Sequence, residues 1–206
     1  DDWVLRTGAK YLESLHDDVF DAAGNALLTE GRFELAGGIL GAIDDEDFMT
    51  GVIIRPDAGE TEASVPSQFV VSAGDYSWKN VVVDRPADNT VALQVSGGNV
   101  STEVLQATQG NASVTGGTLH ANQLVSDGTF TMSVGEGGDF TVGEFVGNQG
   151  GNFRLSAGTM QAQEISLSDG ASLTIAQGTM LTTSSAQVFT TGLGENGTAD
   201  PVDGLK

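Results

Sequence analysis

Two acidic residues in the repeated part of the chain are the first candidates for chemistry. Asp127 and Asp169 each precede a glycine and occupy the same predicted turn, two repeats apart. A glycoside hydrolase needs two carboxyl groups that face each other across a cleft, and strands two coils apart lie about 9–10 Å from each other. The repeat between them has Gln149 at this turn, and Asp-Gly is an ordinary turn dipeptide. Turn formation therefore explains both acids better than catalysis does.

Basic residues and histidines add little to a catalytic mechanism. A polysaccharide lyase needs a base that abstracts a proton next to a carboxylate, often beside calcium. Arg154 is the only lysine or arginine in residues 98–187, and the only histidines are His16 and His120. His120 falls at an outward strand position, so we expect a solvated side chain rather than a metal ligand. We predict that the protein is not an enzyme, with a polysaccharide hydrolase or lyase as the alternative.

Two acidic segments have the oxygen ligands that calcium prefers. Asp44–Asp47 is a run of four acids, but it lacks the alternate-acid spacing and the turn glycine of an EF-hand loop. Gly135–Asp139 partly matches a calcium-binding nonapeptide, yet it occurs once, and such sites need stacked copies. We therefore predict no cofactor and no metal site, and leave open whether the acidic N-terminal clusters bind calcium.

A glycine recurs along the chain at nearly constant spacing, and this repeat defines the architecture. From Gly98 onward the steps are 19, 21, 20 and 20 residues, and the step from Gly74 to Gly98 is 24. A period of about 20 residues is typical of a stacked repeat. The repeating glycines are Gly74, Gly98, Gly117, Gly138, Gly158 and Gly178.

Apolar side chains keep a fixed distance from each repeating glycine. The second residue after it is apolar in every repeat, as in Val100 and Leu119, and polar residues such as Ser101 and His120 follow. Alternation of this kind is typical of a strand with one face inward. A segment of 20 residues cannot bury its own apolar face, so each coil must lie on the next. The sequence predicts an all-β, right-handed parallel β-helix of about six coils.

Composition divides the chain into three parts. Eighteen of its 28 acids precede Gly98, and the second half is polar but weakly charged. We predict an N-terminal cap over residues 1–50, because an open stack exposes unpaired backbone. Residues 11–20 have the spacing of a short amphipathic helix but could instead form irregular strand, and strands are predicted near 26–28 and 33–35. The β-solenoid follows over residues 51–187. Residues 188–206 are predicted to be a flexible tail, and the last coil has Ser185 at the seventh position, where apolar residues stand elsewhere.

One segment is predicted to leave the surface of the coils. The longer first step contains Arg85, Pro86, Asp88 and Asn89, and proline with asparagine or aspartate favours a loop. Loops of repeat proteins often carry binding residues, so these four residues form a candidate contact site.

Net charge limits the partners of this surface. The chain of 206 residues has a formal net charge of −20 and contains no cysteine. Such a surface repels phosphate backbones and anionic lipid headgroups, and no apolar run approaches the length of a membrane span. We therefore predict neither nucleic-acid binding nor membrane insertion of this segment.

The repeat also resembles a known group of proteins. Coils of about 20 residues that read glycine, any residue, apolar, any residue, small, rich in Gly, Ser, Thr and Asn and free of Cys, resemble autotransporter passenger domains and the filamentous adhesins of Gram-negative bacteria. The resemblance covers residues 70–187. It implies a secreted β-helix that is displayed on the bacterial cell surface, and a chain that is one piece of a longer protein.

These observations together favour a stalk or adhesin that is not an enzyme. The expected location is the extracellular space or the bacterial cell surface. The expected partners are a host glycan or surface protein and the neighbouring domains of a longer chain. A scaffold piece of a self-assembling surface layer is a further alternative, because a stack with an open end can associate end to end.

Overall fold

The chain folds into a parallel β-solenoid. The computed structural model describes residues 3–5, 25–28, 32–40, 51–55, 68–85, 91–177 and 179–188. All regular structure in these residues is β, without a helix, and the strands wind through about five turns. The predicted fold class is confirmed. The predicted right-handed winding stays a prediction.

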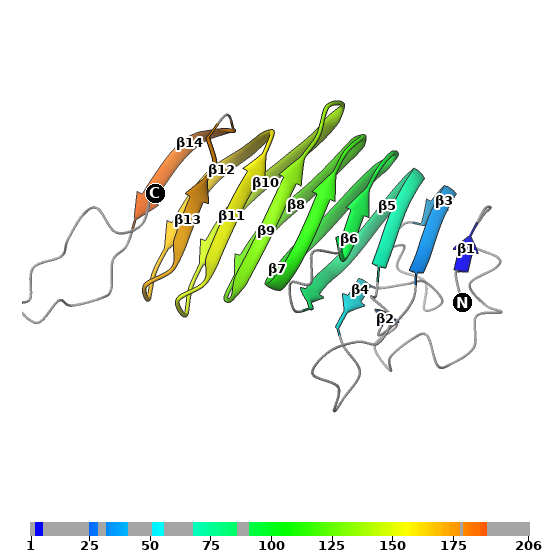
Figure 1. Ribbon diagram of the computed structural model, residues 1–206, viewed down its shortest axis with the longest axis horizontal. Coiled ribbons are helices and arrows are strands. Elements are labelled where there is room, and N and C mark those ends of the chain that lie inside the picture. The colour runs from blue at the N-terminus through cyan, green and yellow to red at the C-terminus, as the bar shows by residue number, and fades with distance from the viewer. Residues whose placement is uncertain are drawn as a thin grey trace, which may run out of the picture.

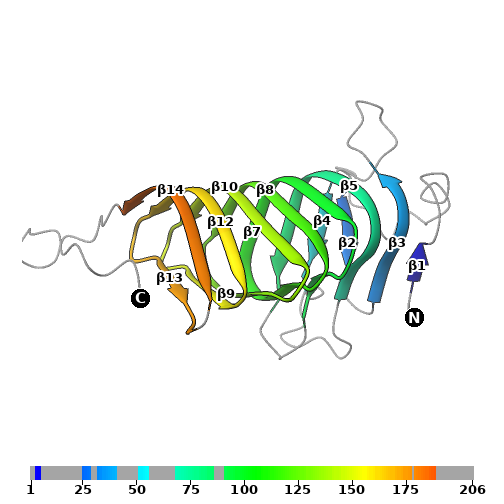
Figure 2. The same cartoon turned by 90° about the horizontal axis from the view of Figure 1, so that it is seen from above.

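The described residues form fourteen strands of one continuous sheet, and every pairing among them is parallel. Figures 1 and 2 show them following one another along the long axis, with β1 and β3 near one end and β14 at the other. The strands are β1 (Trp3–Leu5), β2 (Asn25–Leu28), β3 (Arg32–Leu40), β4 (Gly51–Ile54), β5 (Gln68–Asp84), β6 (Leu93–Val95), β7 (Asn99–Val114), β8 (Gly117–Ser126), β9 (Thr129–Val134), β10 (Gly138–Gly147), β11 (Asn152–Ala157), β12 (Thr159–Leu167), β13 (Ser172–Ile175) and β14 (Met180–Val188).

Each coil presents three sides, and each side pairs with the same side of the next coil. Strands β8, β10, β12 and β14 bend once, so that each contributes to two sides. Strands β9, β11 and β13 supply the third side. The long strand β7 runs along all three sides, because it pairs with β8 and then with β9. Each coil therefore closes around a core that no coil could build alone.

Two predicted inward rows run through the core. The second residue after each repeating glycine pairs with its equivalent in the next coil, and so does the seventh residue. These side chains are buried, with 3% exposure or less. The rows are Tyr76, Val100, Leu119, Phe140 and Met160, and Val81, Leu105, Leu124, Phe145 and Ile165.

The last coil departs from the predicted register. Met160 pairs with Leu181 rather than with Met180, and Met180 is 54% exposed. The prediction that Met180 faces inward is wrong, because this coil has one more residue before its first strand than the repeat requires. The shift also places Ala186, not Ser185, opposite Ile165. The backbone pairing therefore aligns an alanine, not a serine, with the seventh position of the preceding coils.

The described strands before residue 51 continue the same parallel stack. β2 pairs with β4, and β3 pairs with β5, in the sense of the later coils. The predicted strands near residues 26–28 and 33–35 are confirmed as β2 and β3. Several predicted features lie outside the described residues: the segment near residues 11–20, Asp44–Asp47 and His16. The predicted tail also lies outside them, except for Val188 at the end of β14.

An aromatic cluster joins the first described coils. Phe33 stacks on Phe69 with ring centroids 5.2 Å apart, and Trp78 meets Phe69 edge-on at 5.7 Å. Tyr76 stacks on Trp78 at 5.6 Å, and its hydroxyl lies 2.9 Å from the carbonyl oxygen of Gly37 in β3. Burial raises the pKa of the Tyr76 phenol, and the nearby Asp75 carboxylate also raises it. The backbone N–H of Gly37, which donates to the phenol oxygen across 3.3 Å, lowers it. The raised pKa follows because desolvation is the largest of these effects.

Candidate functional site

The acids proposed as a hydrolase pair do not occupy equivalent positions. Ser126 pairs with Gly147, and Gly147 pairs with Leu167, so Asp127 stands in line with Asn148 and Ser168. Asp169 lies one residue further along its corner and corresponds to Gln149. The prediction that Asp127 and Asp169 share one turn is wrong, because the corner changes length between their coils.

The corner lengthens from two residues to four. Thr129 pairs with Asn152, and Asn152 with Ser172, so two residues follow Ser126, and four residues follow each of its equivalents in the later coils. Gln149 and Gly150 have φ of 52° and 73°, and Asp169 and Gly170 have φ of 53° and 78°. Two consecutive positive φ values, with hydrogen bonds of 2.8 and 3.0 Å closing the turns, are typical of type I′ turns. Asp169 is therefore a turn residue.

The carboxylate of Asp127 has a single described hydrogen-bond donor. The Gln106 amide Nε2 donates to Oδ2 across 3.3 Å. Asp127 Oδ1 and Asn148 Oδ1 are both buried without a hydrogen-bond partner in the described structure. The positions in line with Asp127 carry an amide and a hydroxyl, so no carboxyl group of the next two coils stands at the position equivalent to Asp127.

The candidate contact loop is described only at its first residue. Arg85 is 2% exposed, and its backbone N–H donates to the carbonyl oxygen of Gln109 across 3.1 Å. Its side chain is therefore covered rather than presented to a partner. Pro86, Asp88 and Asn89 lie outside the described residues.

His120 faces outward, as predicted, but it belongs to a hydrogen-bonded arrangement. Its Nδ1 lies 2.8 Å from Thr141 Oγ1 in the next coil, and its Nε2 lies 3.2 Å from Asn122 Oδ1. With Nε2 protonated, the ring donates to Asn122 and accepts from the Thr141 hydroxyl. Both ring nitrogens are engaged, and the imidazole is therefore held in a fixed orientation on the surface.

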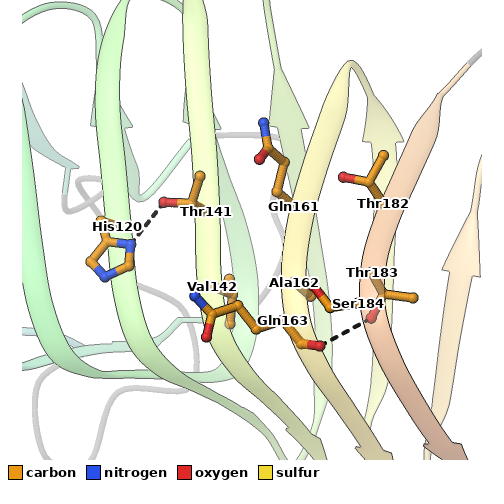
Figure 3. Close-up of a pocket in the computed structure, with 9 residues that line it drawn as sticks. All are labelled: His120, Thr141, Val142, Gln161, Ala162, Gln163, Thr182, Thr183 and Ser184. Atoms are coloured by element: carbon orange, nitrogen blue, oxygen red, sulfur yellow. Dashed lines mark hydrogen bonds between the residues drawn. The ribbon is translucent and has the colours of Figure 1, made fainter.

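A groove of ≈ 410 Å³ opens beside His120 on the outer surface of β8, β10, β12 and β14. Figure 3 shows His120, Thr141, Gln161 and Thr182 following one another along the solenoid axis. The pairing register supports this row, because each residue is the partner of the next. The other lining residues are Val142, Ala162, Gln163, Thr183 and Ser184.

A glycine, Gly143, lies at the bend beside the groove, between two coils that carry amide side chains there. Asn122, Gly143 and Gln163 occupy the same bend in successive coils, since the residues on both sides of them pair. A Cβ atom at Gly143 would lie 2.5 Å from the carbonyl oxygen of Asn122, so the bend accepts only glycine there. The bend therefore carries amides on two coils and a gap between them.

The groove is polar and carries no formal charge. Hydroxyl, amide and imidazole groups line it, Val142 and Ala162 are 2% and 3% exposed, and none of the lining residues is Asp, Glu, Lys or Arg. Glu144 and Glu164, paired with each other, begin the next side of their coils. Within the described residues, no group of three or more His, Cys, Asp or Glu is placed to hold a metal ion. The chemistry that this surface offers is hydrogen bonding.

The sequence predicted the outward positions of three residues of this row, but it did not predict that they line a groove. His120, Thr141 and Gln161 occur at the predicted outward positions of their repeats. The register of the last coil, which adds Thr182 rather than Leu181, could not be obtained from the glycine spacing. The site emerges only when that coil is aligned by its strand pairing.

Comparisons with known proteins identify no relative of this chain. Neither a family model, a curated protein nor a solved structure matches it. The part of the chain that the structure describes contains no helix long and apolar enough to cross a membrane.

Proposed function

We propose that this protein is a non-enzymatic β-solenoid that is secreted or displayed on a bacterial cell surface, where it acts as a stalk or adhesin. The observation that carries the proposal is the uncharged hydrogen-bonding surface of the groove, which extends over four coils. Such a surface can hold a partner by many weak contacts. It offers no pair of carboxyl groups that could divide a reaction between an acid and a base.

The architecture supports a role that depends on length. In a stacked repeat each coil contacts only its neighbours, so stability and surface both grow with the number of coils. A rod of this kind can hold a binding surface at a distance from the cell on which it is displayed. Under the proposal, its partners are a host glycan or surface protein and the neighbouring domains of a longer chain.

The competing enzyme hypothesis concerns Asp127 and Asp169, whose positions in the coil differ. The test incubates the purified protein and the variants Asp127→Asn and Asp169→Asn with a panel of plant, bacterial and animal polysaccharides. We expect undegraded chains in every sample. Cleavage by the wild type that either variant abolishes would overturn the proposal.

Adhesion is tested directly with beads. Beads coated with the protein are expected to adhere to epithelial cells, and beads coated with denatured protein are expected not to adhere. Equal adhesion by both would contradict the adhesin role. Sedimentation at rising concentration separates the remaining alternative, because a surface-layer scaffold would associate end to end, whereas an adhesin would not.

A further inference from the structure

We propose that the groove of His120, Thr141, Gln161 and Thr182 binds a neutral oligosaccharide that lies along the solenoid axis. This inference rests on the proposed adhesin function and names the ligand class and the site. The hydrogen-bonding groups of the groove, its lack of charge and its length each favour such a ligand.

The groove has hydrogen-bonding capacity that the protein does not use. Among the described residues, no hydrogen bond engages the side chains of Gln161, Gln163 or Thr182, and Gln161, Gln163 and Thr182 are exposed. An amide and a hydroxyl each donate and accept. Sugar hydroxyl groups also donate and accept, so they are complementary to this set without any change of protonation.

His120 gives the row a rigid end. Its ring is held between Thr141 and Asn122 by contacts of 2.8 and 3.2 Å. A side chain that is already ordered loses little conformational entropy when a ligand binds. The imidazole face is therefore a preorganised apolar surface beside the hydroxyls and amides, which suits the mixed polar and apolar surface of a sugar ring.

Charge selects against ionic ligands. The lining residues carry no formal charge, and the paired Glu144 and Glu164 begin the neighbouring side. An anionic glycan would meet no cation in the groove and a net charge of −20 on the whole chain. A cationic ligand would find no carboxylate in the lining. The binding of a neutral ligand depends on neither of these charge interactions, so it should change little with salt.

The length of the row favours an oligomer over a single sugar. The four residues belong to four consecutive coils, and strands of a sheet lie about 4.8 Å apart, so the row spans about 14 Å. A ligand that uses the whole row must be extended. This requirement fits a linear chain of several sugar units.

The experiment measures affinity for neutral hexasaccharides of glucose, galactose and mannose, with heparin as an anionic probe and chitosan oligomers as a cationic probe. The test variant is Gln161→Ala/Thr182→Ala. The matched control is Thr131→Ala/Thr174→Ala, which removes outward threonines from β9 and β13 on another side of the coils. Circular dichroism confirms that both variants fold.

We expect at least one neutral hexasaccharide to bind the wild type. Each hydrogen bond lost should lower affinity about fivefold, so the test variant should bind about 25-fold more weakly and the control within twofold of the wild type. Raising salt from about 0.05 to 0.5 M should change the affinity less than twofold.

Three results would overturn the inference: no binding to any neutral hexasaccharide, tighter binding to heparin or chitosan, or equal loss in the test and control variants. The bead assay keeps this failure separate from failure of the proposed function. Adhesive beads without sugar binding would refute the glycan site and leave an adhesin that recognises a protein. Sugar binding by a protein whose beads do not adhere would refute the adhesin and leave the site.

Discussion

Substituting Gly128 or Gly150 with alanine should lower the stability of the protein by different amounts, although both glycines follow a polar residue in the same corner of the coil. At Gly128, in the two-residue corner, a Cβ atom would lie 1.9 Å from the carbonyl oxygen of Thr108. That atom is backbone of the previous coil and cannot rotate away. At Gly150, in the four-residue corner, nothing lies within 4 Å of the added Cβ, but φ is +73°.

The expected magnitudes follow from these two situations. Gly150→Ala costs only the left-handed backbone, about 1–2 kcal/mol. Gly128→Ala must push two coils apart by more than 1 Å, and overpacking of this severity costs about 3 kcal/mol or more. For a chain of about 200 residues, 1 kcal/mol corresponds to about 2–4 °C in melting temperature. We therefore expect a fall of about 6–12 °C for Gly128→Ala and about 2–8 °C for Gly150→Ala.

The assay is thermal unfolding followed by circular dichroism, with both variants measured beside the wild type. The difference between the two variants is the informative quantity, since each substitution adds the same methyl group. A loss of melting temperature at Gly150 equal to or larger than that at Gly128 would contradict the close contact between Gly128 and Thr108. It would mean that the corner around Gly128 is not in contact with the coil before it.

Three further predictions concern the core, the last coil and a buried phenol. Phe153 is fully buried and stacks on Phe130 with ring centroids 5.7 Å apart, so Phe153→Ala should lower the free energy of unfolding in urea by about 3–5 kcal/mol. Leu181→Ser should destabilise the protein by about 1–2 kcal/mol, because Leu181 packs against the core, and Met180→Ser should change stability by less than about 0.5 kcal/mol; the reverse order would contradict the register shift. Because burial raises the pKa of Tyr76 in the folded state, the unfolded phenol releases its proton first, so the contribution of Tyr76 to stability should be constant below about pH 10 and should be lost above it. Tyr76→Phe should fall less steeply there in urea titrations, and parallel curves would contradict this cause.

The glycine period was sufficient to predict the stack, because a repeat of constant length fixes which residues pair. Val100, Leu119 and Phe140 could be assigned to one inward row from spacing alone, and the structure confirms the assignment. The reason is physical: a coil with an inward polar residue would bury it without a partner at every step of the stack.

Spacing failed where a corner changed length. The corners after Gly147 and Leu167 have four residues, so Asp169 does not occupy the position of Asp127. One extra residue before β14 places Leu181 rather than Met180 opposite Met160. Local dipeptides such as Asp-Gly do not encode the length of the corner that contains them. For the same reason the groove could not be predicted, since it depends on Thr182 lying opposite Gln161.

We propose that the groove over β8, β10, β12 and β14 binds a neutral glycan. The most direct test is a titration of the isotope-labelled protein with the neutral hexasaccharide that binds best, followed by the amide signals in nuclear magnetic resonance spectra. We expect the shifts to be concentrated at five groove residues, with the sugar recovered uncleaved: His120, Thr141, Gln161, Gln163 and Thr182. Shifts concentrated on β9, β11 and β13, or at the corner of Asp127 and Asn148, would contradict it.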